Sequence, residues 1–245
     1  ISRGDWSSDV CSSDLSNAML AQRISSINSL SFLCEKTGAN INEVSTAIGM
    51  DHRIGDKFLK PSPGFGGSCF QKDILNLVYL CKHYGLDDVA EYWHQVIKIN
   101  NKQRFRLAMK VKDYIENKKM EKKVTILGWA FKKQTNDSRE SSSIYIALQL
   151  LKYGHQISIY DPKIKKSRII NDLVELNNLK QIINNKEIKK KIKVLNSLND
   201  AISDKHPLVI TTEWDEFCEL NNLKGNYHIF DFRNIIDRKK TIFSL

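Results

Sequence analysis

The sequence predicts an α/β protein in which an all-helical domain is followed by a Rossmann-like domain with a doubly wound parallel sheet. Two observations carry this prediction. Apolar residues recur at helical spacing through residues 18–117. Residues 124–231 then alternate short apolar segments with helical ones, which is typical of parallel α/β sheets. The polar segment 117–123 marks the boundary, so we assign residues 16–118 and 119–245 to the two domains.

The first 15 residues are excluded from the fold prediction. They show no helical or strand period, they contain the near-repeat SSDV/SSDL, and they resemble a translated sequencing adapter. We interpret residues 1–15 as non-native and expect the native chain to begin near Ser16, within a longer protein. No apolar segment typical of an export signal is present in this stretch.

Four helices are predicted in the first domain. Residues 18–36 place Leu20, Ile24, Ile27, Leu30 and Cys34 on one face, and Gly38 ends the helix. The polar residues of this helix (Gln22, Arg23 and Asn28) are interpreted as surface or helix-packing residues. A short helix follows at 40–49, and another at 73–83. The helix predicted at 87–117 would be about 45 Å long, a length typical of a helix that joins two domains or forms a dimer seam.

The second domain begins with a strand, a helix and a strand. The strand is predicted at 124–127, a helix capped by Ser141–Ser143 follows, and the next strand spans 156–160. The first turn reads GWAFKK, so the GxGxxG dinucleotide-binding fingerprint is absent there. The remaining predicted elements are helices within 163–193, a strand ending at Val194, a helix at 198–203, a strand at 208–211, a helix starting in TEWDEF, and a last strand at 228–231.

Composition excludes several functional classes. The chain has 245 residues and is 41% hydrophobic, so it can bury a core. No apolar run reaches the ~18 residues of a membrane-spanning helix, and no membrane partner is expected. The 5 cysteines form no CxxC pairs, which fits a reducing compartment and predicts neither a disulfide scaffold nor a metal site.

The net charge of +10 is compatible with a nucleic-acid partner or with a small anionic ligand. The basic residues concentrate in 98–133 and 163–193 and lack the interleaved aromatic residues of single-strand binders. We therefore expect solvated helix faces and a nucleotide diphosphate pocket, with no nucleic-acid partner.

The loop PSPGFGGSCFQKD, residues 61–73, is the strongest candidate site. Its three glycines precede Cys69 and allow backbone turns through positive φ. A thiol at the start of a helix lies in a field that favours the thiolate, and Lys72 adds positive charge. Asp73 lies one turn further on the same face, where it can accept a proton or hold a water. The loop suits covalent chemistry by a sulfur nucleophile, and a small core cysteine in a turn is the alternative.

Two further groups of residues are candidates. Arg53, Lys57 and Lys60 form either an anion cradle or an ordinary solvated loop. The second group follows predicted strands, and such residues share the rim where parallel sheets bind ligands. Its members are Phe131, Lys132, Glu213, Trp214 and Arg233.

The segment GFGGSCFQKD resembles the catalytic-cysteine loop of the UDP-glucose/GDP-mannose dehydrogenase family. The flanking segments AQRISSINSL and LNLVYL and the block ILGWAFKKQTNDSRESSSIYIALQLL are similar to the same family, so the resemblance covers residues 16 to 237. It implies a central helical dimerisation domain, a C-terminal Rossmann-like UDP-sugar-binding domain, a homo-oligomer formed through the central helices, and a cytoplasmic oxidoreductase.

The resemblance also implies a reaction. Members of the family oxidise the C6 hydroxyl of UDP-glucose to UDP-glucuronate in two hydride transfers to NAD. Cys69 would attack the C6 aldehyde to give a thiohemiacetal, and the second transfer would leave a thioester that water hydrolyses. Asp73 and Asn17 correspond to catalytic residues. The family carries a catalytic lysine where this chain has Ser13, a departure that the interpretation of residues 1–15 explains.

Binding residues follow from the same resemblance. Arg53 would reach into the site of a neighbouring subunit. The sequence FDFRN departs from the glycine that the family more often has before the arginine. The implied contacts with the sugar nucleotide are Arg53, Phe58, Lys60, Pro61, Ser62, Pro63, Gly64, Phe65, Gly66, Phe131, Lys132 and Arg233, and those with NAD are Cys69, Phe70, Gln71, Lys72 and Arg139.

Two alternatives remain open. One is a sister enzyme that acts on GDP-mannose or a UDP-N-acetylhexosamine, and the other is a non-catalytic nucleotide-sugar-binding or dimerisation module. We expect the family's NAD-binding domain and its general acid/base glutamate to lie outside this chain. The chain alone is therefore expected to bind UDP-sugar weakly and to turn over nothing.

Overall fold

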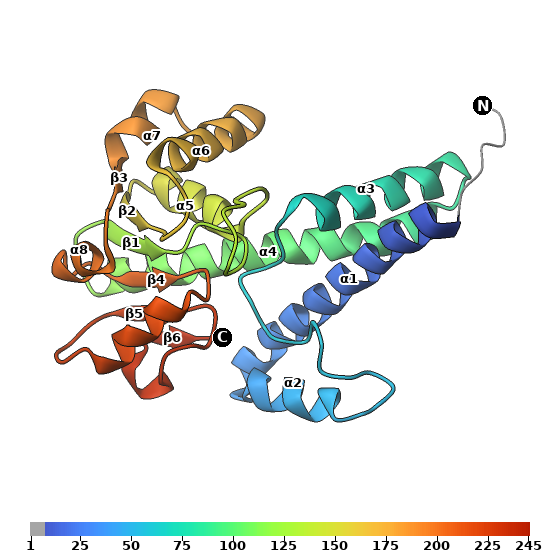
Figure 1. Cartoon of the computed structure of the whole chain (residues 1–245), viewed down its shortest axis with the longest axis horizontal. Helices are drawn as coiled ribbons and strands as arrows, with labels where there is room; N and C mark the ends of the chain where they lie inside the picture. Colours follow the sequence, from blue (N-terminus) through green and yellow to red (C-terminus); the bar gives the residue numbers. More distant parts are fainter. Residues whose placement is uncertain (1–7) are drawn as a thin grey trace. The chain divides into compact units, whose positions relative to one another are not determined.

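The structure is a computed structural model that describes residues 8–245, with side chains from residue 12 onward. The chain divides into two compact units, residues 1–102 and 103–245 (Figure 1). Residues 1–7 of the segment that we interpret as non-native lie outside the described residues. No helix in the described part of the chain has the length and apolarity needed to cross a membrane.

Unit 1 is helical. Its helices are α1 (Ser8–Thr37), α2 (Ile41–Gly49), α3 (Ser68–His83) and the first part of α4 (Asp87–Asn117), and Figure 1 shows α1 and α3 packed along each other. The predicted start of the first helix near residue 18 is wrong, because α1 begins ten residues earlier, at Ser8. Adding turns to an existing helix costs much less than starting one, so a segment with little apolar periodicity can extend it.

The helix of the glycine loop starts at Ser68 and not at residue 73, so the predicted start is five residues late. Gly67, at φ +85°, is the residue before the first turn. The prediction that the glycine loop leads into a helix at Cys69 is confirmed, because Cys69 is the second residue of α3. The bounds predicted for α4 are also confirmed.

The core of unit 1 forms around residues from every helix. Phe65 packs with Ile74 and Val78 of α3, and with Ala18, Ala21, Cys81, Ala90, Val96 and Ile97. A smaller cluster contains Ile27, Cys34, Ile41 and Leu59.

Unit 2 is built on a six-stranded sheet in the order β3-β2-β1-β4-β5-β6, and every pair is parallel. This is the strand order of doubly wound dinucleotide-binding sheets, and it confirms the predicted parallel α/β fold. The elements are β1 (Lys123–Leu127), α5 (Ser142–Lys152), β2 (Gln156–Tyr160), α6 (Lys166–Lys180), α7 (Asn185–Lys191), β3 (Ile192–Val194), α8 (Leu198–Ser203), β4 (Leu208–Ile210), η1 (Asp215–Asn222), β5 (Ile229–Asp231), η2 (Arg238–Lys240) and β6 (Phe243–Ser244).

Two predictions about unit 2 are wrong in detail. The strand at 229–231 is not the last, because β6 follows it and pairs with β5 through Phe230 and Phe243. With two residues, β6 is too short to show a period in the sequence. The helix that follows β4 is a 3₁₀ helix, η1, and begins at Asp215.

The core of unit 2 joins the sheet to the end of α4. Leu107, Val111 and Ile115 of α4 are fully buried against the same cluster as the strands. Gly128, directly after β1, has φ +97°, and a Cβ there would lie 2.4 Å from the Cβ of Thr212. Only glycine fits this crossing, so the loops after β1 and β4 can lie close together.

Candidate functional site

The predicted catalytic residues of unit 1 lie on two adjacent helices. Cys69 is exposed in the first turn of α3, and Asp73, one turn later, is 3% exposed. Asn17 of α1 donates a hydrogen bond from Nδ2 to Oδ2 of Asp73 at 2.8 Å. Lys72 Nζ lies 3.5 Å from the other oxygen, Oδ1. The structure therefore brings together Asn17 and Asp73, which are 56 residues apart in the chain.

The second carboxylate oxygen of Asp73 has unused accepting capacity. Oδ1 is buried and has no hydrogen-bond donor among the described residues, although it is close to the ammonium of Lys72. Buried carboxylate oxygens normally accept hydrogen bonds. An oxygen in this state, one helical turn from a thiol, can accept a hydrogen bond from a water that attacks a group on the sulfur.

The glycine loop is held by two buried asparagines. Asn28 of α1 accepts a hydrogen bond from the backbone N–H of Ser62 at 2.9 Å. Asn100 of α4 accepts from Phe65 N at 2.8 Å and donates to Phe65 O at 3.2 Å. Asn28 was interpreted as a surface residue or a helix-packing residue. Because it is fully buried, it is not a surface residue. The available signal was its position four residues after Ile24, on the apolar face of the helix.

Most of the loop predicted to bind the sugar nucleotide is itself buried. Pro61, Ser62, Pro63, Gly64 and Phe65 are all buried, whereas Gly66 is partly exposed. Because the backbone amides of Ser62 and Phe65 donate to asparagine side chains, these two amides have a structural partner. Contacts of this loop with a ligand stay a prediction.

Three aromatic rings surround the start of α3. The ring of Phe70 lies 5.9 Å from that of Phe65 and 6.3 Å from that of Phe58. Phe58 is 42% exposed and has φ +62°, an uncommon conformation for a bulky residue. Lys60 is exposed. Phe58 and Lys60 thus leave an aromatic face and a cation accessible beside the buried loop.

Arg53 is engaged within its own turn. Its guanidinium bonds Asp51 through Nε–Oδ1 at 3.0 Å and Nη2–Oδ2 at 2.6 Å, and the side chain is 78% exposed. The hydrogen bond raises the pKa of Arg53 and lowers the pKa of Asp51. The described contacts therefore join Arg53 to Asp51, and an anion cradle formed with Lys57 and Lys60 stays a prediction.

In unit 2, Arg233 connects the loops that follow three strands. Its Nε donates to Thr211 O at 2.8 Å and its Nη2 donates to Phe131 O at 3.1 Å. Nε also lies 3.0 Å from Glu213 Oε2. Burial lowers the pKa of the Arg233 guanidinium, and the nearby carboxylate of Glu213 opposes that change. The prediction that Phe131, Glu213 and Arg233 share a rim is confirmed.

The other two predicted rim residues differ. Lys132 is exposed, and its Nζ lies 5.4 Å from the centroid of the Phe131 ring. Trp214 is buried, and its Nε1 donates to Asp161 Oδ2 at 3.1 Å. Asp161 also accepts from the backbone N–H of Trp129 and of Ala130, at 2.6 and 3.0 Å. Sequence reasoning missed Asp161 as an organiser of this rim, although its place directly after β2 was a usable signal.

The residues predicted to contact NAD lie in both units. Phe70, Gln71 and Lys72 follow Cys69 in the first turns of α3. Arg139, in unit 2, bonds Asp137 through Nε–Oδ1 at 3.0 Å and Nη2–Oδ2 at 2.7 Å. Hydrogen bonding to Arg139 lowers the pKa of Asp137. The described contacts leave the roles of these residues toward NAD as predictions.

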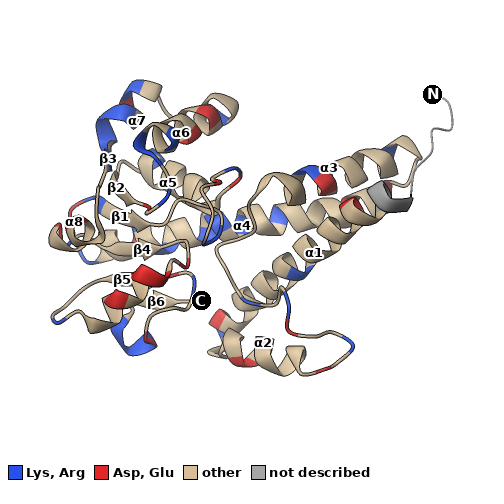
Figure 2. Cartoon of the chain, viewed as in Figure 1, with Lys and Arg blue, Asp and Glu red and all other residues tan. Residues whose placement is uncertain are grey.

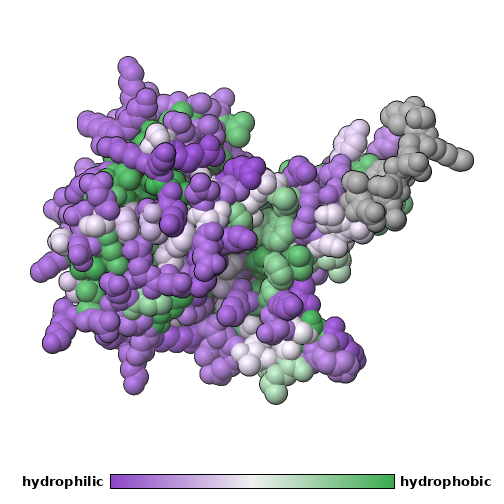
Figure 3. Space-filling model, viewed as in Figure 1, coloured by the Kyte–Doolittle hydropathy of each residue, from purple (hydrophilic) through white to green (hydrophobic). Residues whose placement is uncertain are grey.

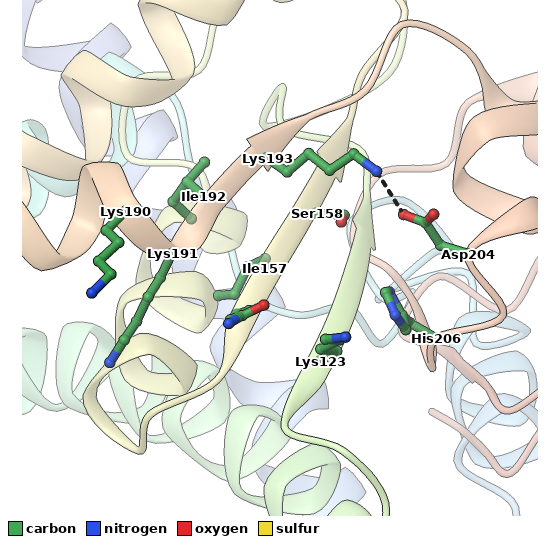
Figure 4. A pocket seen from close by; sticks show the side chains of 10 residues that line it. Lys123, Ile157, Ser158, Lys190, Lys191, Ile192, Lys193, Asp204 and His206 are labelled. Atoms are coloured by element: carbon green, nitrogen blue, oxygen red, sulfur yellow. Dashed lines mark hydrogen bonds and ion pairs between the residues drawn. The ribbon is translucent and has the colours of Figure 1, made fainter.

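A basic cavity of about 350 Å³ lies at the opposite edge of the sheet, where β1, β2 and β3 begin (Figure 4). Lys123, Lys190, Lys191, Lys193 and His206 line it, and Figure 2 shows positive residues gathered over α7 and β3. Three of these lysines already have a carboxylate partner: Lys123 with Glu121, Lys191 with Glu187, and Lys193 with Asp204. These pairs neutralise much of the charge, which fits the expected solvated helix faces.

Each of the two units contains a segment that matches a known family model. Residues 13–102 match the model of the UDP-glucose/GDP-mannose dehydrogenase family, central domain. Residues 125–238 match the model of the same family's UDP binding domain.

Several curated relatives are about 50% identical to this chain over the aligned residues. UDP-glucose 6-dehydrogenase of Mus musculus is 50% identical over 239 residues, which cover 95% of this chain and 47% of the relative. UDP-glucose 6-dehydrogenase of Caenorhabditis elegans is 47% identical over 245 residues, which cover 98% and 50%. The chain thus spans about half the length of the curated relatives that it matches.

Solved structures support the fold. A UDP-glucose dehydrogenase from Pyrobaculum islandicum superposes with a TM-score of 0.75 at 24% identity and covers 96% of this chain and 49% of that chain. A UDP-D-ManNAc dehydrogenase from Pyrococcus horikoshii gives 0.69 at 21% identity, with 94% and 50% covered. Since the two family models together match well over half of the residues, the chain belongs to the UDP-glucose/GDP-mannose dehydrogenase family.

Proposed function

We propose that the chain is the central and UDP-sugar-binding part of an NAD-dependent UDP-glucose 6-dehydrogenase, which oxidises UDP-glucose to UDP-glucuronate. This substrate is supported by the sequence identity of 50% and 47% to two UDP-glucose 6-dehydrogenases over the aligned residues. The observation that carries the proposal is the exposed thiol of Cys69 at the start of α3, one turn before the buried Asp73 that accepts a hydrogen bond from Asn17.

Cys69 is proposed as the nucleophile. Its sulfur forms a bond to the C6 carbon of the aldehyde, and the aldehyde oxygen takes a proton to give a thiohemiacetal. Loss of a hydride from C6 and of the proton of the C6 hydroxyl leaves a thioester on Cys69. Water then adds to the thioester carbon, the C–S bond breaks, and the products are a carboxylate and the free thiol.

Asp73 and Asn17 act in the hydrolysis of the thioester. Oδ1 of Asp73, which has no hydrogen-bond donor among the described residues, accepts the proton of the attacking water. Asn17 holds the other oxygen, Oδ2, at 2.8 Å and thereby fixes the orientation of the carboxylate. Asn17 is thus a positioning residue for the proposed base.

NAD is the proposed acceptor of both hydrides, and its chemistry when bound is that of a two-electron oxidant. The first turn of α3 fits an anionic dinucleotide in part, because Lys72 has a side chain that is 74% exposed. Phe70, Gln71 and Arg139 are the other chain residues that we propose to contact it.

Each unit contains residues that we propose as contacts for a sugar nucleotide. Lys132 has no carboxylate partner among the described residues and can pair with the diphosphate. Phe131 and Phe58 offer ring faces, and Arg233 orders the rim through Thr211 O and Phe131 O. Lys60, Arg53 from a neighbouring subunit, and the loop of residues 61–66 complete the proposed set.

A homo-oligomer formed through the central helices, in the cytoplasm, is part of the proposal. Large apolar side chains are exposed on and beside α3 and α4 in unit 1, and apolar residues are visible over the helices of this unit in Figure 3. Exposed apolar side chains that gather in a patch are typical of interfaces. These residues are between 43% and 69% exposed, and they are Leu75, Tyr79, Tyr84, Leu86, Val89 and Tyr92.

The test uses this chain extended by the amino-terminal half that its relatives carry, with UDP-glucose and NAD. Cys69→Ala is expected to lower NADH formation by a factor on the order of 10³ or more, because the nucleophile is lost. Cys218→Ala is the matched control, since Cys218 is also an exposed free cysteine, and it should keep normal turnover. Normal turnover by Cys69→Ala would refute the proposal.

The sister activities are separated by binding. UDP-glucose is expected to bind the extended protein more tightly than GDP-mannose or a UDP-N-acetylhexosamine in titration calorimetry. Tighter binding of either competitor would assign the chain to a different nucleotide sugar, while leaving the role of Cys69 in place.

A further inference from the structure

We propose that Asn28 and Asn100 are positioning residues that hold the glycine loop in the conformation that places Cys69. This inference rests on the proposed function of Cys69 as a nucleophile. Neither asparagine touches the sulfur. Each acts through the backbone of the segment that leads to it, and the two come from different helices, α1 and α4.

The two side chains fix both ends of one short segment. Asn28 Oδ1 takes the N–H of Ser62, and Asn100 binds both the N–H and the C=O of Phe65. Only Gly66, Gly67 and Ser68 then separate Phe65 from Cys69. Since glycines resist bending very little, the place of Cys69 depends on what anchors Phe65 and on the start of α3.

The geometry at Asn100 requires a carboxamide. A group that accepts from Phe65 N and donates to Phe65 O at the same time needs one oxygen and one N–H₂ on a flat fork. Aspartate has the acceptor but no donor, and alanine has neither. Asn100 is fully buried, so water does not readily replace either bond.

Burial of the Asn28 side chain costs free energy, although the side chain makes only a single hydrogen bond to the loop. The residue is fully buried, and its Nδ2 has no hydrogen-bond partner among the described residues. An apolar side chain would pack at this position of α1 without leaving a buried amide nitrogen unsatisfied. An apolar residue would lose the hydrogen bond that Asn28 Oδ1 accepts from Ser62 N.

Positioning of this kind acts on the chemical step. A displacement of a reacting atom by about 1 Å can lower a rate on the order of a hundredfold. Loss of either anchor is therefore expected to lower kcat, and since residues 61–66 are also proposed to contact the sugar nucleotide, it is expected to raise KM for UDP-glucose by a smaller factor.

The test compares Asn28→Ala, Asn100→Ala and Asn100→Asp with a matched control, Ser25→Ala. Ser25 is buried on α1 and donates to Val96 O at 2.7 Å, so the control also removes a buried hydrogen bond between α1 and α4 but does not touch the loop. Labelling of Cys34 and Cys81, which are buried, reports whether a variant has unfolded.

Two readouts are measured. In this chain, amide hydrogen exchange should become at least about tenfold faster at Ser62 in Asn28→Ala and at Phe65 in Asn100→Ala. Exchange at both amides should be unchanged in Ser25→Ala. In the extended protein, kcat should fall about 10- to 100-fold in both alanine variants, and KM for UDP-glucose should rise by a smaller factor. Asn100→Asp, which keeps one of two bonds, should lie between alanine and asparagine.

Unchanged exchange at Ser62 and Phe65 would overturn the proposal, since the anchors would then not hold the loop. Faster exchange with a kcat equal to that of Ser25→Ala would also overturn it, because the anchored conformation would not matter for the sulfur. Failure of the proposed function gives a different result, because Cys69→Ala would then stay active whatever the exchange rates are. Failure of the positioning role alone would leave Cys69→Ala inactive and the kcat of the anchor variants equal to that of Ser25→Ala.

Discussion

Cys69, Asp73 and Asn17 show what a sequence can and cannot supply for single residues. The type and spacing of Cys69 and Asp73 place them one helical turn apart, and this local relation needs no knowledge of the fold. The hydrogen bond from Asn17 to Asp73 joins two helices, so only the family resemblance suggested Asn17. The burial of Asn28 and Asn100 around the loop is a tertiary fact of the same kind.

His155 is a buried titratable group with a predictable effect on stability. It is fully buried, neither ring nitrogen has a hydrogen-bond partner among the described residues, and burial, with the nearby charge of Lys122, lowers its pKa from 6.5 to about 4. The folded state therefore favours the neutral ring. This stabilisation is present above pH 6.5 and is lost as the pH falls from 6.5 toward about 4.

Replacing His155 with leucine should remove that pH dependence. Across the window from pH 6.5 to about 4, the free energy of unfolding of the unchanged chain should fall by about 3 kcal/mol more than that of His155→Leu. Urea unfolding at neutral pH and near pH 4.5 measures the difference. If both proteins lose equal stability on acidification, His155 is not the group responsible.

At the scale of elements, the ends of a helix or strand could be predicted where the sequence contains clear start and stop residues. The bounds of α4, β2 and α8 agree with the sequence prediction, since acidic residues, glycines and a β-branched run mark their ends. The starts of α1 and α3 were placed too late, because both helices begin in segments without an apolar period. The strand β6 has two residues and exists only through its pairing with β5.

The crossing of the loops after β1 and β4 gives a prediction for Gly128. A Cβ at this residue would overlap Thr212 at 2.4 Å, and its φ of +97° is also unfavourable for other residues. Gly128→Ala should lower the free energy of unfolding by about 3 kcal/mol or more, as overpacking adds to backbone strain. Chemical denaturation measures this loss.

Gly154→Ala is the control for Gly128→Ala. Gly154 has a similar φ of +88°, but a Cβ there would meet nothing within 4 Å. Its substitution should cost only the backbone strain, about 1 to 2 kcal/mol. Equal losses for the two variants would show that close approach to Thr212 does not matter.

At the scale of the whole molecule, the fold class was predictable and the strand order was not. Alternating strand and helix segments indicate a parallel sheet, whichever strand lies at its centre. The order β3-β2-β1-β4-β5-β6 depends on pairings between residues far apart in the chain, such as Thr125 with Leu208. The rim formed by Phe131, Glu213 and Arg233 follows from that order, since it places β1, β4 and β5 side by side.

The exposed apolar residues of unit 1 predict self-association. Light scattering should show a dimer or larger assembly of the chain, and Tyr79→Glu combined with Tyr92→Glu should shift it toward the monomer, because two charges would have to be buried at the interface. Leu179→Glu, at an 81% exposed apolar residue of α6, is the control and should leave the assembly unchanged. A monomer at micromolar concentration before any substitution would rule out this interface.

During the proposed reaction, the sulfur of Cys69 becomes bonded to C6 of the sugar. The most direct measurement is mass mapping of the extended Asp73→Asn protein after mixing with UDP-glucose and NAD, because loss of the proposed base should slow hydrolysis of the thioester and let it accumulate. The account predicts one rapid burst of NADH and a UDP-glucuronosyl adduct on the peptide that contains Cys69. Sustained turnover with no adduct on that peptide, or an adduct on another residue, would contradict it.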